Sequence, residues 1–122
     1  MTNEAIIRGD IFIAHIPQPA EADHLLYGAR PVVCIGHLDP WSKLVTVAPM
    51  QRIEPGREAG PYDLQLCADR LNRMDKPGSI VRTTQLRTIP ADWLHFRLGR
   101  MSDADMYRLE RCIANYLDFQ VK

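Results

Sequence analysis

The sequence predicts a mainly β, α+β fold, in which a small and strongly bent antiparallel sheet or barrel carries one C-terminal helix. Two observations support this prediction. Five short segments with the composition of β-strands are separated by turns and loops, and one amphipathic segment follows them near the end of the chain. The 122 residues suit a single domain, 1–122, with one core and little room for a second.

The first four strand predictions come from short apolar runs bounded by turn residues. Pro17 and Pro19 end the first run, and Asp39-Pro40 marks the turn between the second and the third. The second run is apolar at most positions, which is typical of a strand buried on both faces. The four segments are 9–16 (GDIFIAHI), 31–37 (PVVCIGH), 43–50 (KLVTVAPM) and the weaker 62–68 (YDLQLCA).

The fifth predicted strand, 79–90 (SIVRTTQLRTIP), has the β-branched content of a strand but no simple alternation. With a period of two, Arg82 falls on the face of Ile80, whereas Arg87 falls on the face of Val81. One arginine would then lie on each side, with threonines and a glutamine between them. Such a strand could line a site with one face and make dimer or helix contacts with the other.

A C-terminal helix is predicted from Ser102 to about Phe119. Ser102 occupies the N-cap position, and Asp103 and Asp105 follow in the first turn, where acidic side chains are favourable. Apolar residues then recur at helical spacing and form one stripe. The recurring residues are Met106, Leu109, Ile113 and Tyr116 or Leu117, and we expect the first three to be core or dimer surface.

Two long segments between predicted strands, 17–30 and 51–60, are expected to be functional or mobile, because connections in a small β scaffold are usually short. Fifteen basic and fifteen acidic residues cancel, so the net charge argues neither for nor against nucleic acid. Residues 79–100 carry a local net charge of +3. This excess permits a phosphate-binding surface, and a solvated charged edge fits it about as well.

Composition argues against several other classes of protein. The apolar runs are too short for a membrane span and the N-terminal residues lack the sections of a signal peptide, so we expect a cytoplasmic protein without a membrane partner. Three widely spaced cysteines are typical of a reduced protein: Cys34, Cys67 and Cys112. Three histidines lack the mutual spacing of metal ligands: His15, His37 and His95. Neither a metal nor a cofactor is expected.

Several pieces of the chain, in this order, resemble the PemK/MazF/Kid toxins of type II toxin–antitoxin modules. The pieces are 8–16 (RGDIFIAHI), 28–36 (GARPVVCIG) and 81–89 (VRTTQLRTI), leading to 97–106 (RLGRMSDADM) and the last helix. The resemblance implies an SH3-like barrel of the CcdB/PemK kind and a homodimer. It also implies a metal-independent, sequence-specific endoribonuclease that cleaves single-stranded RNA and is inhibited by an antitoxin.

The resemblance also implies three catalytic residues. Arg30 matches the arginine of the family's RPV motif, and His24 lies six residues before it, where Kid-like members have a histidine. Arg82 matches the arginine of the VRxxQ segment. Cleavage of RNA without a metal uses the 2′-hydroxyl as the nucleophile, with a base, an acid and positive charge on the phosphorane oxygens. Arg30 and Arg82 would clamp the phosphate, and His24 would transfer a proton.

Four further residues are predicted to bind substrate. Gln85 matches the family's glutamine, and Thr83 accompanies it in the segment that would face RNA. Gln51 and Thr84 depart from the family pattern, which has a threonine and an aspartate at these positions. Gln51 can still hydrogen-bond a phosphate or a base edge. With Thr84 in place of the aspartate, the chain shows no second acid or base.

The sequence is also compatible with two other functions. A binding module on the same fold, either a catalytically silent relative or a gyrase poison like the CcdB toxins, is favoured by the missing aspartate and threonine. An SH3-like module that binds peptides through aromatic residues ranks last, because the aromatic content of 7% indicates no clear aromatic groove.

Structural roles remain as alternatives for individual residues. Arg82 could pair with a carboxylate such as Asp10, and Arg30 could anchor the long loop by donating to its carbonyl groups. Gly9 and Asp10 are expected to form a turn and a cap or salt bridge before the first strand. Trp41 could stack on a base or pack against the protein. Trp93 is expected to plug the end of the barrel.

Overall fold

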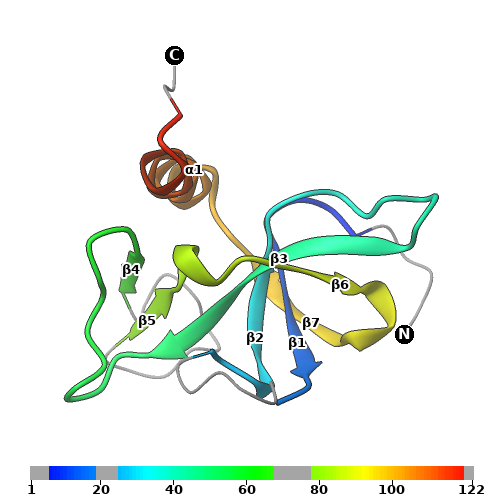
Figure 1. Cartoon of the computed structure of the whole chain (residues 1–122), viewed down its shortest axis with the longest axis horizontal. Coiled ribbons are helices and arrows are strands. Elements are labelled where there is room, and N and C mark those ends of the chain that lie inside the picture. The colour runs from blue at the N-terminus through cyan, green and yellow to red at the C-terminus, as the bar shows by residue number, and fades with distance from the viewer. Residues whose placement is uncertain (1–5, 19–24, 68–77, 120–122) are drawn as a thin grey trace.

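The computed structural model describes residues 6–18, 25–67 and 78–119. Figure 1 shows strands that cross in a bent sheet, with one helix packed over the end that carries β4 and β5. The strands are β1 (Asp10–Ile16), β2 (Gly28–Cys34), β3 (Leu44–Arg52), β4 (Leu64–Cys67), β5 (Gly78–Val81), β6 (Arg87–Pro90) and β7 (Leu94–Arg100). The helices are the 3-10 turns η2 (Thr83–Gln85) and η3 (Ala91–Trp93) and the α-helix α1 (Asp103–Leu117).

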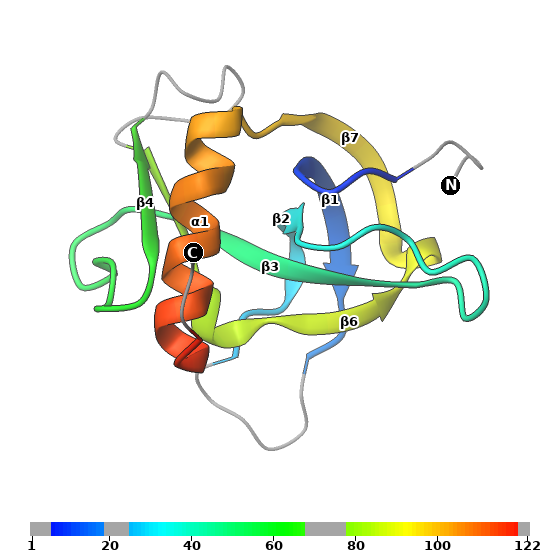
Figure 2. The same ribbon diagram turned by 90° about the horizontal axis from the view of Figure 1, so that it is seen from above.

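The strands form one antiparallel sheet in the order β4-β5-β3-β2-β1-β7, and β6 pairs with β3 beside this path. β3 is the longest strand and holds the sheet together, since it pairs with β2, β5 and β6. Figure 2 shows β3 running beneath α1 toward β6. The antiparallel α+β class is confirmed. Because β6 and β7 do not pair with each other, the barrel that the sequence predicted is not closed among the described strands.

The single strand predicted over 79–90 is wrong. β5 pairs with β3 at Met50–Arg52, and β6 pairs with β3 at Leu44–Val47. Between these strands the backbone N–H of Arg82 donates to the carbonyl of Pro49 at 2.9 Å, and the chain then turns through η2. The alternation fails in the sequence because this 3-10 turn changes the direction of the side chains that follow it.

Other strand boundaries differ more modestly from the prediction. β2 begins at Gly28 and ends at Cys34, whereas the sequence predicted 31–37. Its last three residues are fully buried, as expected for a strand covered on both faces. β3 and β4 lie where strands were predicted. β7 was missed, because most of its side chains are exposed and it lacks an apolar run.

The core consists of two clusters of buried side chains on opposite faces of the central strands. Adjacent residues of one strand belong to different clusters, so that Ile11 and Val33 pack in the first while Phe12 and Val32 pack in the second. α1 covers the first cluster with Met106 and Leu109, and Ile113 is partly buried against it. The part of the predicted stripe from Met106 to Ile113 is therefore core, whereas Tyr116 and Leu117 are exposed. Trp93 packs against the second cluster.

The structure confirms Ser102 as the N-cap of α1, since its side-chain oxygen accepts from the backbone N–H of Asp105 at 3.1 Å. Replacing Ser102 with alanine leaves that N–H without this acceptor. We expect Ser102→Ala to lower the free energy of unfolding by about 1 kcal/mol. Urea denaturation followed by circular dichroism measures this change, and Ser102→Asp, which keeps an acceptor, should show little loss.

Asp10 and Gly9 have the structural roles that the sequence indicated. Gly9 has φ of 98°, a backbone conformation that glycine adopts without strain. The buried carboxylate of Asp10 accepts from the backbone of Ile7 at 3.0 Å and pairs with Arg97 at 3.1 Å and Arg100 at 3.0 Å. These contacts join the start of β1 to β7.

The thiol of Cys34 lies in the second cluster and has no exposed surface. Burial, and then the nearby charge of Asp10, raise the pKa of its thiol to about 12, so the group stays protonated at neutral pH. None of the helices in the described residues is long and apolar enough to cross a bilayer.

Candidate functional site

A cleft of about 340 Å³ opens beside β2 and the C-terminal end of β3. We call it the arginine cleft, because three of its lining residues are arginines, while no acidic residue lines it among those the structure describes. Its polar lining residues are Arg30, Gln51, Arg52, Arg57 and Ser79, and its apolar ones are Ile13, Ala29, Pro31, Met50 and Leu98.

Arg30 extends from β2 and is held in place by backbone oxygens. Its Nε donates to the carbonyl of Tyr27 at 3.0 Å and its Nη1 donates to the carbonyl of Met50 at 3.1 Å. Burial, and then the positive charge of Arg57, lower the pKa of Arg30 from its ordinary value, although a guanidinium stays charged at neutral pH. Within the described part of the chain, Arg30 forms no ion pair with a carboxylate. Its charge is therefore available to an anion in the cleft.

Gln51 connects the arginine cleft to Arg82. The Nε of Arg82 donates to Oε1 of Gln51 at 2.9 Å, which leaves the NH₂ group of Gln51 without a partner among the described residues. Arg82 also donates through Nη1 to the carbonyl of Glu58 at 3.0 Å and to Oδ2 of Asp63 at 2.7 Å. The side chains of Arg82 and Asp63 are 15% and 5% exposed, so their ion pair is largely buried.

Asp63 is a residue that sequence reasoning missed. Besides pairing with Arg82, its carboxylate accepts from the backbone of Gly60 at 2.9 Å and of Thr83 at 3.2 Å. It therefore ties the end of the 51–60 segment to the turn after β5. The sequence alternative that paired Arg82 with a carboxylate is therefore right about the ion pair, but the partner is Asp63 and not Asp10. Nothing in local spacing identifies Asp63, because the pairing of β4 with β5 brings it to Arg82.

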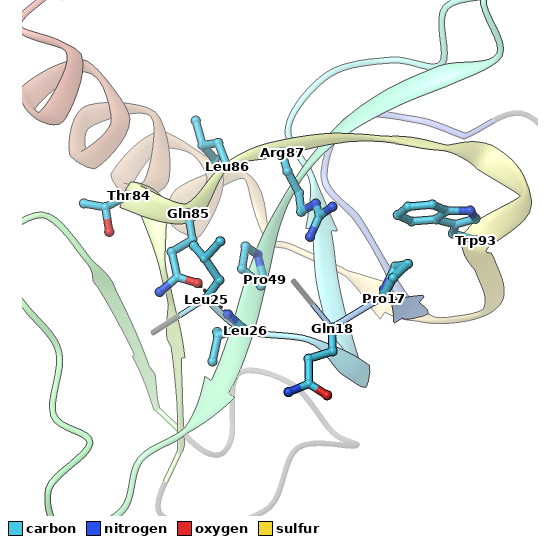
Figure 3. A pocket seen from close by; sticks show the side chains of 10 residues that line it. All are labelled: Pro17, Gln18, Leu25, Leu26, Pro49, Thr84, Gln85, Leu86, Arg87 and Trp93. Atoms are coloured by element: carbon cyan, nitrogen blue, oxygen red, sulfur yellow. Dashed lines mark hydrogen bonds between the residues drawn. The ribbon is translucent and has the colours of Figure 1, made fainter. Parts of the chain in front are cut away.

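A second and larger cavity, of about 540 Å³, has Pro49 in its lining and is mostly apolar (Figure 3). We call it the apolar groove. Figure 3 shows Gln85 beside Leu25 and Leu26, at the end away from Trp93. Its lining residues are Pro17, Gln18, Leu25, Leu26, Pro49, Thr84, Gln85, Leu86, Arg87 and Trp93. Oε1 of Gln85 accepts from the backbone of Leu26 at 2.9 Å, and the guanidinium of Arg87 lies 5.8 Å from the centre of the Trp93 ring.

The structure divides the predicted site residues between these two cavities. Arg30 and Gln51 line the arginine cleft, with Arg82 bonded to Gln51 at its margin. Thr84 and Gln85 line the apolar groove instead. Both cavities are lined by residues of β3, Pro49 in the groove and Met50 and Gln51 in the cleft.

Two predicted residues remain: Thr83, which lines neither cavity, and His24. Thr83 is fully buried, and its hydroxyl donates to the carbonyl of Tyr62, so it supports the turn after β5. His24 falls in 19–24, outside the described residues. Trp41 is 95% exposed in the turn between β2 and β3, so the packing role that the sequence offered for it is not seen among the described residues.

Comparison with known protein families gives a match over residues 7–117 to the model of the PemK-like, MazF-like toxin of type II toxin–antitoxin systems. The chain belongs to this family. A search of curated proteins finds no match. The resemblance to these toxins, which rested on the motifs in 8–16, 28–36, 81–89 and 97–106, is therefore confirmed.

Solved structures of toxins from this family share the fold. The Mycobacterium tuberculosis toxin MazF-mt6 is 22% identical, with a TM-score of 0.65 over 92% of this chain and 99% of that one. MazF from Deinococcus radiodurans is 15% identical, with a TM-score of 0.68 over 93% and 96%. A mycobacterial endoribonuclease in complex with its cognate antitoxin is 17% identical, with a TM-score of 0.68 over 99% and 100%.

In this PemK/MazF-like chain, the two residues interpreted from the sequence as departures from the family pattern lie in different surroundings. Gln51 is long enough to accept from Arg82 while it lines the cleft. Thr84 is exposed in η2 and lines the apolar groove. The carboxylate that pairs with Arg82 is that of Asp63, which directly precedes β4.

Proposed function

We propose that this toxin is a metal-independent endoribonuclease that cleaves single-stranded mRNA at particular sequences by attack of the 2′-hydroxyl. The observation that carries the proposal is Arg30: a partly buried guanidinium, held by two carbonyl oxygens, faces a cleft without a carboxylate among its described lining residues. A site with these features favours a phosphate, whose oxygens accept charge-assisted hydrogen bonds from arginine.

The residues would share the reaction as follows. Arg30 stabilises the negative charge that develops on the phosphorane oxygens, and the NH₂ group of Gln51 donates to the same phosphate. Arg82 keeps Gln51 in position through the bond to Oε1. His24 serves as the base or acid, since an imidazole can exchange protons near neutral pH. A base of the RNA chain enters the apolar groove, where Thr84 and Gln85 lie.

Partners follow from the family and from the named relatives. One relative is an endoribonuclease in complex with its antitoxin, and Deinococcus radiodurans MazF is known as a MazE–MazF complex. We propose that a cognate antitoxin binds this chain and blocks the site, that the toxin acts as a homodimer, and that it works in the cytoplasm. An adjacent short reading frame that encodes an acidic tail would support the antitoxin assignment.

The test is incubation of a long single-stranded RNA with purified protein in excess EDTA. We expect discrete fragments that end in a 2′,3′-cyclic phosphate, detected by mass spectrometry, and loss of these fragments in His24→Ala. His24→Ala is purified in the same way, so a contaminating ribonuclease would produce fragments in this variant as well. Fragments that appear only when a divalent metal is restored would contradict the metal-independent reaction.

A catalytically silent binding module is the second candidate. The observation in its favour is that no imidazole or carboxylate lines the arginine cleft among the described residues, while Arg82 is engaged by Asp63. Intact RNA after long incubation, together with a folded protein that still binds RNA or antitoxin, would move this function to first place.

A further inference from the structure

The arginine cleft contains two basic residues that the proposed reaction does not use, Arg52 and Arg57. Arg57 lies in the 51–60 segment, where a tight turn brings its backbone N–H to the carbonyl of Glu54 at 2.8 Å. The turn presents the Arg57 side chain to the same cleft that Arg30 enters from β2. The two guanidiniums therefore converge from different elements.

The partner of Arg57 is easily replaced. Its Nη1 lies 3.3 Å from the carboxylate of Glu54, and the two side chains are 57% and 44% exposed. Exposed pairs of this kind contribute little, because solvent screens them and both side chains lose freedom. A phosphate in the cleft can displace Glu54 at small cost, and it would also relieve the repulsion between Arg57 and Arg30.

Ser79 supplies an independent observation. It lies in β5 opposite Arg52, is 1% exposed, and lines the arginine cleft. Its hydroxyl has no hydrogen-bond partner among the described residues. Buried hydroxyl groups are almost always paired, because a missing bond leaves their desolvation uncompensated. Because this hydroxyl has almost no accessible surface, a rotation of the Ser79 side chain toward the cleft must accompany the bond, and a ligand oxygen would then provide the missing acceptor.

We propose that Arg57 and Ser79 form a second phosphate subsite, which holds the backbone phosphate next to the one bound by Arg30 and Gln51. The inference rests on the proposed function and names two further substrate-positioning residues for it. Arg57 would bind one phosphate edge with its planar fork, while Ser79 donates from the floor of the cleft. The ligand is the phosphodiester backbone of single-stranded RNA.

Binding is tested with a fluorescently labelled pool of random-sequence oligonucleotides that carry 2′-O-methyl groups, which cannot be cleaved through the 2′-hydroxyl. Anisotropy gives the affinity at salt concentrations from about 50 to 200 mM, and each phosphate contact to a single strand contributes about 0.7 to the slope of log affinity against log salt. We expect Arg57→Gln to weaken binding several-fold and to reduce the slope by about 0.7. Ser79→Ala should weaken binding with no change in slope, because it removes no charge.

Two further variants make the test specific. Arg111→Gln removes an exposed arginine from α1, outside the cleft, and should retain both affinity and slope. Glu54→Gln releases Arg57 from its carboxylate and should tighten binding, whereas a merely structural Glu54–Arg57 pair would make both Glu54→Gln and Arg57→Gln bind more weakly. Equal losses in those two variants, or an unchanged slope in Arg57→Gln, would overturn the subsite.

The outcomes separate this inference from the proposed function. If the wild-type protein does not bind the pool at all, the RNA substrate itself is wrong. If the wild type binds and Arg57→Gln binds equally well, only the subsite is wrong. If Arg57→Gln binds RNA normally but loses affinity for an acidic antitoxin peptide, the cleft holds carboxylates of a protein partner and the phosphate assignment fails.

Discussion

Replacing Arg30 with alanine is expected to lower the rate of RNA cleavage about 10²- to 10³-fold, the usual effect of removing one preorganised donor to a developing negative charge. Arg30 is the guanidinium in the arginine cleft that makes no ion pair with a carboxylate among the described residues. The loss should appear in single-turnover cleavage at saturating RNA, because the interaction is strongest when the phosphorane carries its full charge.

The controls separate chemistry from folding. Arg30→Ala also removes bonds to the carbonyls of Tyr27 and Met50, so a loss of about 1 kcal/mol per bond is expected in urea denaturation. Arg30→Lys keeps the charge without the planar fork and should be intermediate in rate. Arg111→Ala, an exposed arginine on α1, should cleave at the wild-type rate. Full activity in a folded Arg30→Ala protein would remove Arg30 from the mechanism.

Replacing Asp63 with alanine is expected to destabilise the protein by about 3–5 kcal/mol, because the substitution leaves Arg82 charged and largely buried without its partner. The side chains of Arg82 and Asp63 are 15% and 5% exposed. Two backbone groups, from Gly60 and Thr83, also lose their acceptor. Urea denaturation of wild type and variant at neutral pH measures the change.

A matched pair in the same chain provides the comparison. Glu54 and Arg57 form an exposed ion pair, and Glu54→Ala should cost no more than about 1 kcal/mol. Replacing both Asp63 and Arg82 with apolar residues should recover part of the stability that Asp63→Ala loses, because no unpaired charge remains. A cost below about 1 kcal/mol for Asp63→Ala would show that Arg82 finds water or another acceptor.

These two predictions assign different roles to the two family arginines. Arg30 is the residue proposed to bind the ligand, whereas Arg82 is engaged by Gln51, Glu58 and Asp63 inside the protein. Arg82 is expected to hold Gln51 in position, and Asp63 holds Arg82. If this support matters for catalysis, the folded molecules of Asp63→Ala should cleave RNA more slowly than folded wild-type protein. The cleavage rate divided by the folded fraction measures the effect.

Local sequence determined the elements whose signals are local. The N-cap at Ser102 and the stripe of Met106 and Leu109 follow from contacts within one helix and from one buried face, and both are confirmed. The buried second strand was recognised because both of its faces are covered, which leaves a continuous apolar run. The family followed from motifs that keep their order along the chain.

Tertiary structure alone decided the contacts between distant segments. The segment 79–90 is broken because it must follow two separate stretches of β3, and strand propensity does not register such a turn. Asp63 becomes the partner of Arg82 only through the pairing of β4 with β5, and Arg57 reaches the cleft of Arg30 only beyond the end of β3, which pairs with β2. The spacing of apolar residues along the sequence indicates which positions are buried. The choice of an ionic partner depends instead on the register of the whole sheet.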